Sequence, residues 1–194
     1  WRFKIISETS IASGIRRIEA ITGDSAIDYF ETQTKAMESI NLSLKNPQNT
    51  LKAINKLQNE NILLKKEISN LEKLKIQIVE KEISNKIEEK KNFSLIIQKV
   101  DLDSQGLKTL SFKMGKKHEN LLMILASAKH NEAIVSCYIS KRLVEKNNFN
   151  AVQIINSLSK YIDGQGGGQS FYAIAGGKNI MGISKALDKA KSLI

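Results

Sequence analysis

A glycine-rich segment near the end of the chain, residues 163–178 (DGQGGGQSFYAIAGGK), carries the residue types best suited to bind a ligand through the backbone. Four of its glycines fall within the five residues 164–168. Because glycine adopts positive φ and lets a ligand approach the main chain, such a loop can present amide N–H groups to a phosphate or a nucleobase edge. A flexible turn that binds nothing is the alternative. The candidate RNA contacts in this segment are Gly166, Gly167, Gly168, Gln169, Gly176, Gly177 and Lys178.

The spacing of these glycines differs from the two common nucleotide-binding motifs. A Walker A loop has Ser or Thr after its Gly-Lys pair, whereas Gly177-Lys178 is followed by Asn179. The dinucleotide-binding pattern of three spaced glycines is also missing. The segment therefore argues against nucleotide hydrolysis.

Basic residues are the second candidate for ligand binding. The chain has 30 Lys and Arg against 20 Asp and Glu, a formal net charge of +10, and residues 93–194 hold 14 basic and 7 acidic residues. Such an excess favours an anionic partner, either nucleic acid or an acidic membrane surface. Lys116, Lys117, Lys141 and Arg142 are the candidate phosphate contacts. The alternative for each is a solvated surface side chain, and lysines at a helix C-terminus also suit the helix dipole.

Residues for catalysis or metal binding are scarce. Cys137 is the single cysteine, and His118 and His130 are the two histidines, so no disulfide, multi-cysteine zinc site or histidine cluster is expected. The sequence shows no grouping of nucleophile, base and acid. No apolar run approaches the roughly 20 residues that cross a bilayer. We expect a cytoplasmic protein without a membrane segment, with no catalytic residue and no metal ligand in this chain.

A helical arm is expected to precede the glycine-rich part. Asp24 or Ser25 can begin a helix that Pro47 ends, and residues 50–91 contain neither glycine nor proline. Apolar residues in the second stretch recur at alternating spacings of three and four, which predicts a long amphipathic helix that packs on the shorter preceding helix or on a second copy. The candidate dimerisation positions are Ile54, Leu57, Asn61, Leu64, Ile68 and Leu71. A solvated helical spacer is the alternative to a dimerising coiled coil.

Residues 93–194 are expected to form a compact α/β module, because short apolar runs alternate there with amphipathic segments. Ser104 and Asn150 are the expected helix N-caps. Aromatic residues in this module can stack on unpaired bases or belong to the core; they are Tyr138, Tyr161, Phe171 and Tyr172. The expected strands are 94–100, 121–126, 133–139 and 171–174, and the expected helices are 104–117, 151–162 and 183–193.

Residues 1–23 are too few to fold alone and are expected to be the last strands of a larger domain. The run from Ser10 to Gly23, SIASGIRRIEAITG, closely resembles the segment that closes the editing domain of alanyl-tRNA synthetases. The glycines at 166–168 and 176–177 resemble the glycine-rich signature of the C-terminal domain of the same enzymes. Many members of that family carry Arg-Pro-Asp after the glycines, where this chain has Gln169-Ser170-Phe171, so the first of these positions lacks the charge of an arginine but keeps hydrogen-bonding capacity.

The resemblance implies a C-terminal fragment of a cytoplasmic enzyme, an alanine–tRNA ligase, that joins alanine to its tRNA with ATP. It implies three parts: an editing-domain remnant (1–23), a helical arm (24–92) that dimerises in some members, and a tRNA-binding domain (93–194). ATP with magnesium, and zinc, would belong to domains outside these residues, so the fragment itself would need no cofactor. The implied partners are the tRNA for alanine, at its outer corner, and a second copy of the chain.

The resulting prediction is a mixed α+β protein, with a long helical hairpin or coiled-coil arm followed by a small α/β globular domain. The alternative function is a dimerisation or scaffold module with little direct RNA contact.

Overall fold

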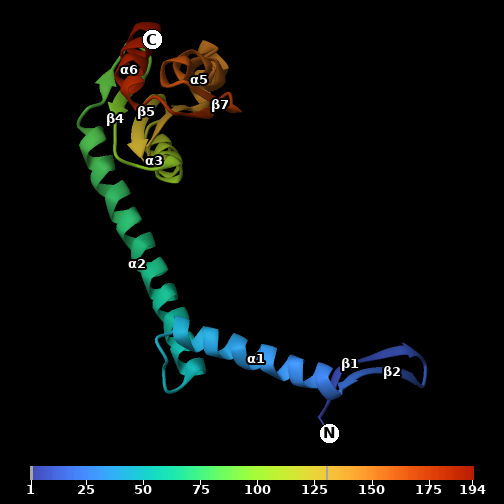
Figure 1. Cartoon of the computed structure of the whole chain (residues 1–194). Coiled ribbons are helices and arrows are strands. Elements are labelled where there is room, and N and C mark those ends of the chain that lie inside the picture. The colour runs from blue at the N-terminus through green and yellow to red at the C-terminus, as the bar shows by residue number, and fades with distance from the viewer. Residues whose placement is uncertain (1, 130) are drawn as a thin grey trace. The chain divides into compact units, whose positions relative to one another are not determined.

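The computed structural model describes residues 2–129 and 131–194. His130 lies outside the described residues. The chain divides into two compact units, Trp1–Lys66 and Glu67–Ile194, and one long helix, α2 (Thr50–Ser84), continues from the first into the second (Figure 1). The domain boundaries that we predict from the sequence, at residues 23/24 and 92/93, are not tested by this division and stay predictions.

The first unit holds a β-hairpin and a helix. Strands β1 (Phe3–Ala12) and β2 (Ile15–Thr22) pair antiparallel, and Gly14 takes φ +76° in the turn between them. Arg17 pairs with Glu19 at 2.5 Å. Helix α1 (Gly23–Ser43) follows directly and confirms the helix predicted before Pro47.

Helix α2 is shorter than predicted, because it ends at Ser84 and not near Lys91. The chain turns there and forms the short strand β3 (Glu88–Glu89), which pairs antiparallel with β4 (Ser94–Lys99). Ile87, between the helix and the strand, packs against the buried core. Sheet pairing and burial of Ile87 thus override the helix propensity of a glycine-free stretch.

The second unit is a small mixed α+β fold built on a six-stranded sheet in the order β3-β4-β5-β6-β8-β7. The remaining strands are β5 (Leu121–Lys129), β6 (Glu132–Ile139), β7 (Gly164–Gln169) and β8 (Tyr172–Gly177). β4 and β5 run parallel and are joined through helix α3 (Ser104–Lys117), whereas the other neighbours pair antiparallel.

Helices cover both faces of the sheet, and this explains why the central strands are continuous apolar runs. Alternate residues of β5 point to opposite faces: Leu122 and Ile124 enter a core with helices α5 (Ala151–Ser159) and α6 (Ile183–Leu193). Leu121, Met123 and Leu125 enter a second core with α3 and the last turns of α2. The last turns of α2 are therefore part of the globular unit.

The N-cap residues differ from the sequence prediction at two helices, and one helix was not predicted. The N-cap residue of α1 is Thr22, not Asp24 or Ser25, and its side chain makes no capping hydrogen bond. The Asn150 side chain caps α5 by accepting hydrogen bonds from the N–H groups of Val152 and Gln153, as predicted. α3 is capped by Asp103 and not by Ser104, because the Asp103 carboxylate accepts from the Gly106 N–H at 2.7 Å. α5 ends at Ser159, and a 3₁₀ turn (Lys160–Ile162) continues it. Helix α4 (Lys141–Asn147) was not predicted.

The glycine-rich segment is the main difference from the sequence prediction. It is not a loop: residues 164–169 form β7, the outermost strand of the sheet, paired with β8 along its length. Glycine has low strand propensity, so composition alone argued against a strand. Pairing with β8 stabilises the extended conformation of this segment despite the low strand propensity of glycine.

Candidate nucleic-acid interface

The glycines of the β7–β8 hairpin divide into two kinds. A Cβ on Gly166 would overlap the Ile174 carbonyl oxygen, and Gly168 has φ +156°, which L-residues rarely adopt. In contrast, a Cβ on Gly167 or Gly176 would meet nothing within 4 Å. Gly166 and Gly168 are thus required for close packing of the two strands, whereas Gly167 and Gly176 leave the surface open.

The hairpin also separates the predicted glycine contacts into two places. Gly168 and Gln169, at its tip, line a hollow of about 270 Å³ together with Lys108 and Phe171. The pair Gly176-Gly177, at the other end, lines a wider hollow of about 640 Å³. The side chains around the wider hollow are Glu132, Lys160, Asp163, Gln165 and Lys178. One continuous glycine surface is therefore not present.

The tip of the hairpin is fixed to the rest of the unit by two backbone hydrogen bonds. The Ser170 carbonyl accepts from the Ala151 N–H at 2.8 Å, and the Phe171 carbonyl accepts from the Ile139 N–H at 2.8 Å. Ile139 ends β6, and Lys141 and Arg142 begin α4 two residues later. The fold thus brings the hairpin tip next to the basic pair.

Lys141 and Arg142 line a third hollow, of about 430 Å³, with Phe112 and Phe171. Both basic side chains are exposed, and Arg142 lies 3.7 Å from the carboxylate of Glu119, which is itself 89% exposed. Ion pairs between exposed groups are weak, so this pairing leaves Arg142 able to exchange Glu119 for a phosphate. The structure therefore brings together Lys141, Arg142, Gly168 and Gln169 out of the predicted contacts.

An aromatic cluster lies between the hollow of about 430 Å³ and the hollow of about 270 Å³. The Phe112 ring centroid lies 5.6 Å from that of Tyr138, 5.4 Å from that of Tyr172 and 6.3 Å from that of Phe171. Tyr161, in contrast, packs against the core under α5 and α6. Phe112 and Lys108 were not predicted as site residues, although their four-residue spacing places them on one face of α3.

Burial keeps the tyrosine hydroxyls of this cluster protonated. It raises the pKa of Tyr172 to about 12, with the buried Cys137 adding to the shift, and it raises the pKa of Tyr138. Burial likewise raises the pKa of the Cys137 thiol, which makes a nucleophilic role for that residue implausible. The aromatic cluster therefore offers ring surface and neutral hydroxyls.

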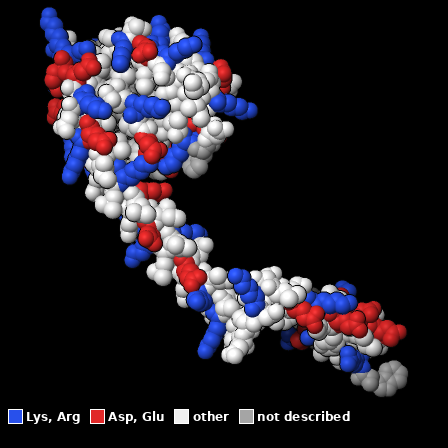
Figure 2. Space-filling model, turned by 60° about the vertical axis from the view of Figure 1, so that its left-hand side comes forward, with Lys and Arg blue, Asp and Glu red and all other residues white. Residues whose placement is uncertain are grey.

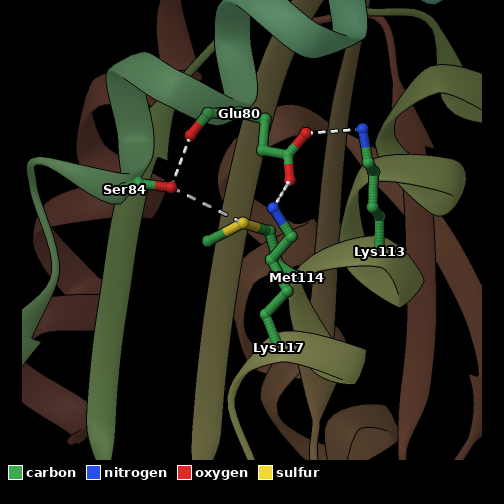
Figure 3. Close-up of polar contacts among 5 residues, drawn as sticks. All are labelled: Glu80, Ser84, Lys113, Met114 and Lys117. Carbon is green, nitrogen blue, oxygen red and sulfur yellow. Dashed lines mark hydrogen bonds and ion pairs between the residues drawn. The ribbon is translucent and has the colours of Figure 1, made fainter.

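Lys117, one of the predicted phosphate contacts, forms an ion pair with an acidic side chain of α2. The carboxylate of Glu80, on α2, lies 2.6 Å from Lys113 Nζ and 2.7 Å from Lys117 Nζ (Figure 3). The Glu80 side chain is 8% exposed. Hydrogen bonds from the two lysines lower the pKa of Glu80, and the bond from Lys113 has the larger effect. Lys116, in the same turn of α3, is exposed and has no ion pair within the described residues. The two ion pairs of Glu80, with Lys113 and Lys117, attach the end of α2 to α3, and we call them the Glu80 clasp.

Basic side chains spread over the visible face of the unit Glu67–Ile194, with acidic side chains among them (Figure 2). Within residues 2–129 and 131–194, no three His, Cys, Asp or Glu side chains are grouped so as to hold a metal ion. Over the same residues, no helix is long and apolar enough to cross a membrane.

The predicted dimerisation positions on α2 are largely uncovered. Leu57, Leu64 and Ile68 are 53%, 57% and 55% exposed, and Leu71 is 58% exposed. Asn61 is exposed as well, and only Ile54 of this set is partly buried. The side chains described in this chain thus leave the apolar stripe open.

Comparison with known proteins identifies the second unit. The family model of the DHHA1 domain matches residues 92–194, slightly more than half of the chain. A protein of Christiangramia forsetii named alanine–tRNA ligase is 47% identical over all 194 residues, which make up 22% of its length. The protein of the same name from Flavobacterium psychrophilum is 41% identical over 190 residues, 98% of this chain and 21% of its own.

Among solved structures, the C-Ala domain of Aquifex aeolicus alanyl-tRNA synthetase matches with a TM-score of 0.49 and 23% identity. The match covers 55% of this chain and 95% of that domain. The chain spans about a fifth of the length of the curated relatives named above. Residues 92–194 form the fold from β4 to α6 that carries the hairpin, the aromatic cluster and the two lysines of the clasp, and the chain belongs to the DHHA1 domain family.

Proposed function

We propose that this chain is the C-terminal, tRNA-binding part of an alanine–tRNA ligase, and that its second unit contacts the outer corner of the tRNA. The whole-chain likeness to proteins named alanine–tRNA ligase supports the enzyme. In such an enzyme, ATP, magnesium and zinc would act in regions other than residues 1–194. The role of this part is to hold the tRNA during aminoacylation and editing in the cytoplasm.

The observation that carries the RNA-binding proposal is the meeting of the basic pair Lys141-Arg142 with the tip of the glycine-rich hairpin. Two exposed cations at a helix start neutralise phosphates without reading sequence. The outer edge of β7 leaves alternate backbone N–H groups without a sheet partner, so it adds hydrogen-bond donors for an RNA backbone. The overall charge of +10 favours the same partner at longer range.

The proposal is tested by measuring the affinity of the full chain for tRNA specific for alanine at two salt concentrations, with a second tRNA and a duplex lacking an elbow as comparisons. If several phosphates are neutralised, affinity falls roughly tenfold or more between low and physiological salt. The double variant Lys141→Gln/Arg142→Gln should lower affinity and reduce the salt slope by up to about 2.

A matched control is Lys65→Gln/Lys66→Gln, which removes the same charge from exposed positions on α2. Binding to both tRNAs but not to the duplex supports elbow contact. Equal losses in the two double variants would show that only net charge matters, and affinity that does not change with salt would refute phosphate contact.

A second candidate function, homodimerisation through a coiled coil, is favoured by the uncovered apolar stripe of α2. Leu64 and Ile68 are both more than half exposed, and burying the exposed part of each in a second copy stabilises a dimer by about 1–2 kcal/mol per side chain. Sedimentation of the chain and of the Leu64→Lys/Ile68→Lys variant tests this. A parent that sediments as a dimer and a variant that sediments as a monomer support dimerisation, and equal masses contradict it.

A further inference from the structure

The two hollows at the hairpin tip share a wall. The larger contains Lys141 and Arg142, the smaller contains Lys108 and Gln169, and both are lined by Phe112 and Phe171. The rings of these two residues lie 6.3 Å apart at an interplanar angle of 74°. The two hollows therefore form one groove, here called the aromatic groove, divided by a pair of half-buried rings.

Each hollow has the size and the lining of a small-ligand site. Volumes of about 430 Å³ and 270 Å³ lie within or just below the range of about 300–1,000 Å³ typical of such pockets. Ser140 lines the larger hollow and Tyr172 the smaller, and the hydroxyl of each is buried without a hydrogen-bond partner in the described structure. Both hydroxyls lie beneath the surface of the hollows, so the rings of Phe112 and Phe171 are what the hollows offer to a flat, aromatic ligand.

The backbone holds the groove open. A Cβ on Gly115, in the last turn of α3, would overlap the Tyr138 hydroxyl, so the glycine makes room for this ring against the helix. On the opposite side, the hydrogen bond from Ile139 N–H to the Phe171 carbonyl fixes the start of β8. The rings are thus positioned before any ligand binds.

We infer that the aromatic groove binds unpaired RNA nucleotides, with one base in each hollow and the rings of Phe112 and Phe171 between them. A duplex hides its bases in the stack, whereas unpaired bases can be splayed onto aromatic side chains. The cations at both ends of the groove, Lys108 at one and Lys141-Arg142 at the other, match the phosphates on either side of such a step. This inference rests on the proposed RNA binding and specifies that the ligand is single-stranded at this site.

The test uses the full chain and a five-nucleotide single-stranded RNA with 2-aminopurine at its centre, because stacking quenches the fluorescence of this base. Quenching that saturates is expected, and an unlabelled single strand should reverse it by competition whereas an unlabelled duplex should not. Phe112→Leu, which keeps apolar bulk and removes the ring, should weaken binding about 5- to 150-fold, the usual effect of losing one stacked base.

The matched control is Phe149→Leu. Phe149 is a half-buried aromatic whose ring centroid lies 5.6 Å from that of Phe93, and it packs against the core under α5 and α6. It should leave binding unchanged. Phe171→Leu provides a second groove variant if Phe112→Leu lowers stability, and circular dichroism of each variant reports its folding.

Equal competition by unlabelled single strand and duplex, or equal effects of the Phe112 and Phe149 variants, would overturn the inference. So would salt-sensitive binding of tRNA without any quenching of the short strand, and that result would leave the proposed function intact. Quenching of the short strand without binding of tRNA would contradict the proposed function and support the groove.

Discussion

The exposure of the three side chains in the Glu80 clasp predicts how much each substitution lowers the unfolding free energy of the second unit. Glu80 is 8% exposed, whereas the side chains of Lys113 and Lys117 are 41% and 59% exposed. Removing the acid leaves two lysines that can turn into water, but removing the lysines leaves a carboxylate in a buried place. We therefore expect Lys113→Met/Lys117→Met to destabilise the second unit more than Glu80→Gln does.

The magnitude has an upper limit, because the stranded carboxylate can escape its charge by binding a proton. At pH 7, protonating a carboxyl whose ordinary pKa is 4.5 costs about 3 kcal/mol, at 1.36 kcal/mol per pH unit. The double lysine variant should thus lose about 2–3 kcal/mol of unfolding free energy. Glu80→Gln should lose about 1–2 kcal/mol, the contribution of hydrogen bonds to a charged group.

The pH dependence distinguishes the two variants further. In the parent, the lysines lower the pKa of Glu80 on folding, so the clasp stabilises fully above the ordinary pKa of 4.5. This contribution is lost as pH falls through the lower pKa of the folded state. In the double lysine variant burial raises the pKa of Glu80 instead, so its deficit relative to the parent should shrink as pH is lowered from 7 to 5.

Urea unfolding, followed by near-ultraviolet circular dichroism, measures these effects, since three of the four tyrosines lie in the second unit. Glu82→Gln is the matched control, because Glu82 is exposed on the same helix and has no ion pair within the described residues. It should change stability by less than about 0.5 kcal/mol. The reasoning is refuted if Glu80→Gln costs as much as the double lysine variant, or if the lysine deficit grows on acidification.

Three further predictions concern single contacts, each measured by the same urea unfolding. Gly166→Ala should cost about 1–3 kcal/mol because its Cβ would overlap the β8 backbone, whereas Gly167→Ala should be nearly neutral because its Cβ points into open space; equal costs would contradict this division. Gly115→Ala should also destabilise by about 1–3 kcal/mol through displacement of Tyr138, outweighing the higher helix propensity of alanine; a more stable variant would contradict the overlap. Asn150→Ala should cost about 1 kcal/mol through loss of the α5 cap, and no change would mean that the cap contributes nothing.

The parts of the fold that the sequence predicts are those with local signals. Asn150 caps α5 through its own neighbours, and helix α6 has the predicted bounds Ile183–Leu193. The strands 94–100 and 133–139 are confirmed within one residue, because their apolar runs are bounded by polar turns. Such signals act within a few residues and need no knowledge of the tertiary structure.

The parts that the sequence does not predict depend on partners far along the chain. Strand β7 exists because β8 pairs with it, and nothing within the glycines themselves favours an extended strand. The Glu80 clasp joins residues more than thirty positions apart, so Lys117 had the sequence signature of a free surface lysine. In both cases a long-range contact decides what a local pattern leaves open.

The candidate site shows the same division. Lys141 and Arg142 are predicted from charge, but the residue that completes their hollow, Phe112, lies on α3 and is brought there by the crossover between β4 and β5. The glycines show the converse, because a motif that suggests ligand contact also supplies close strand packing at Gly166 and Gly168. Only Gly167 and Gly176 combine the motif with open surface. Substituting all the glycines of the motif together would therefore lower stability and RNA affinity at the same time. Separate variants of Gly167 and Phe112 test RNA binding without disturbing the close packing of the two strands.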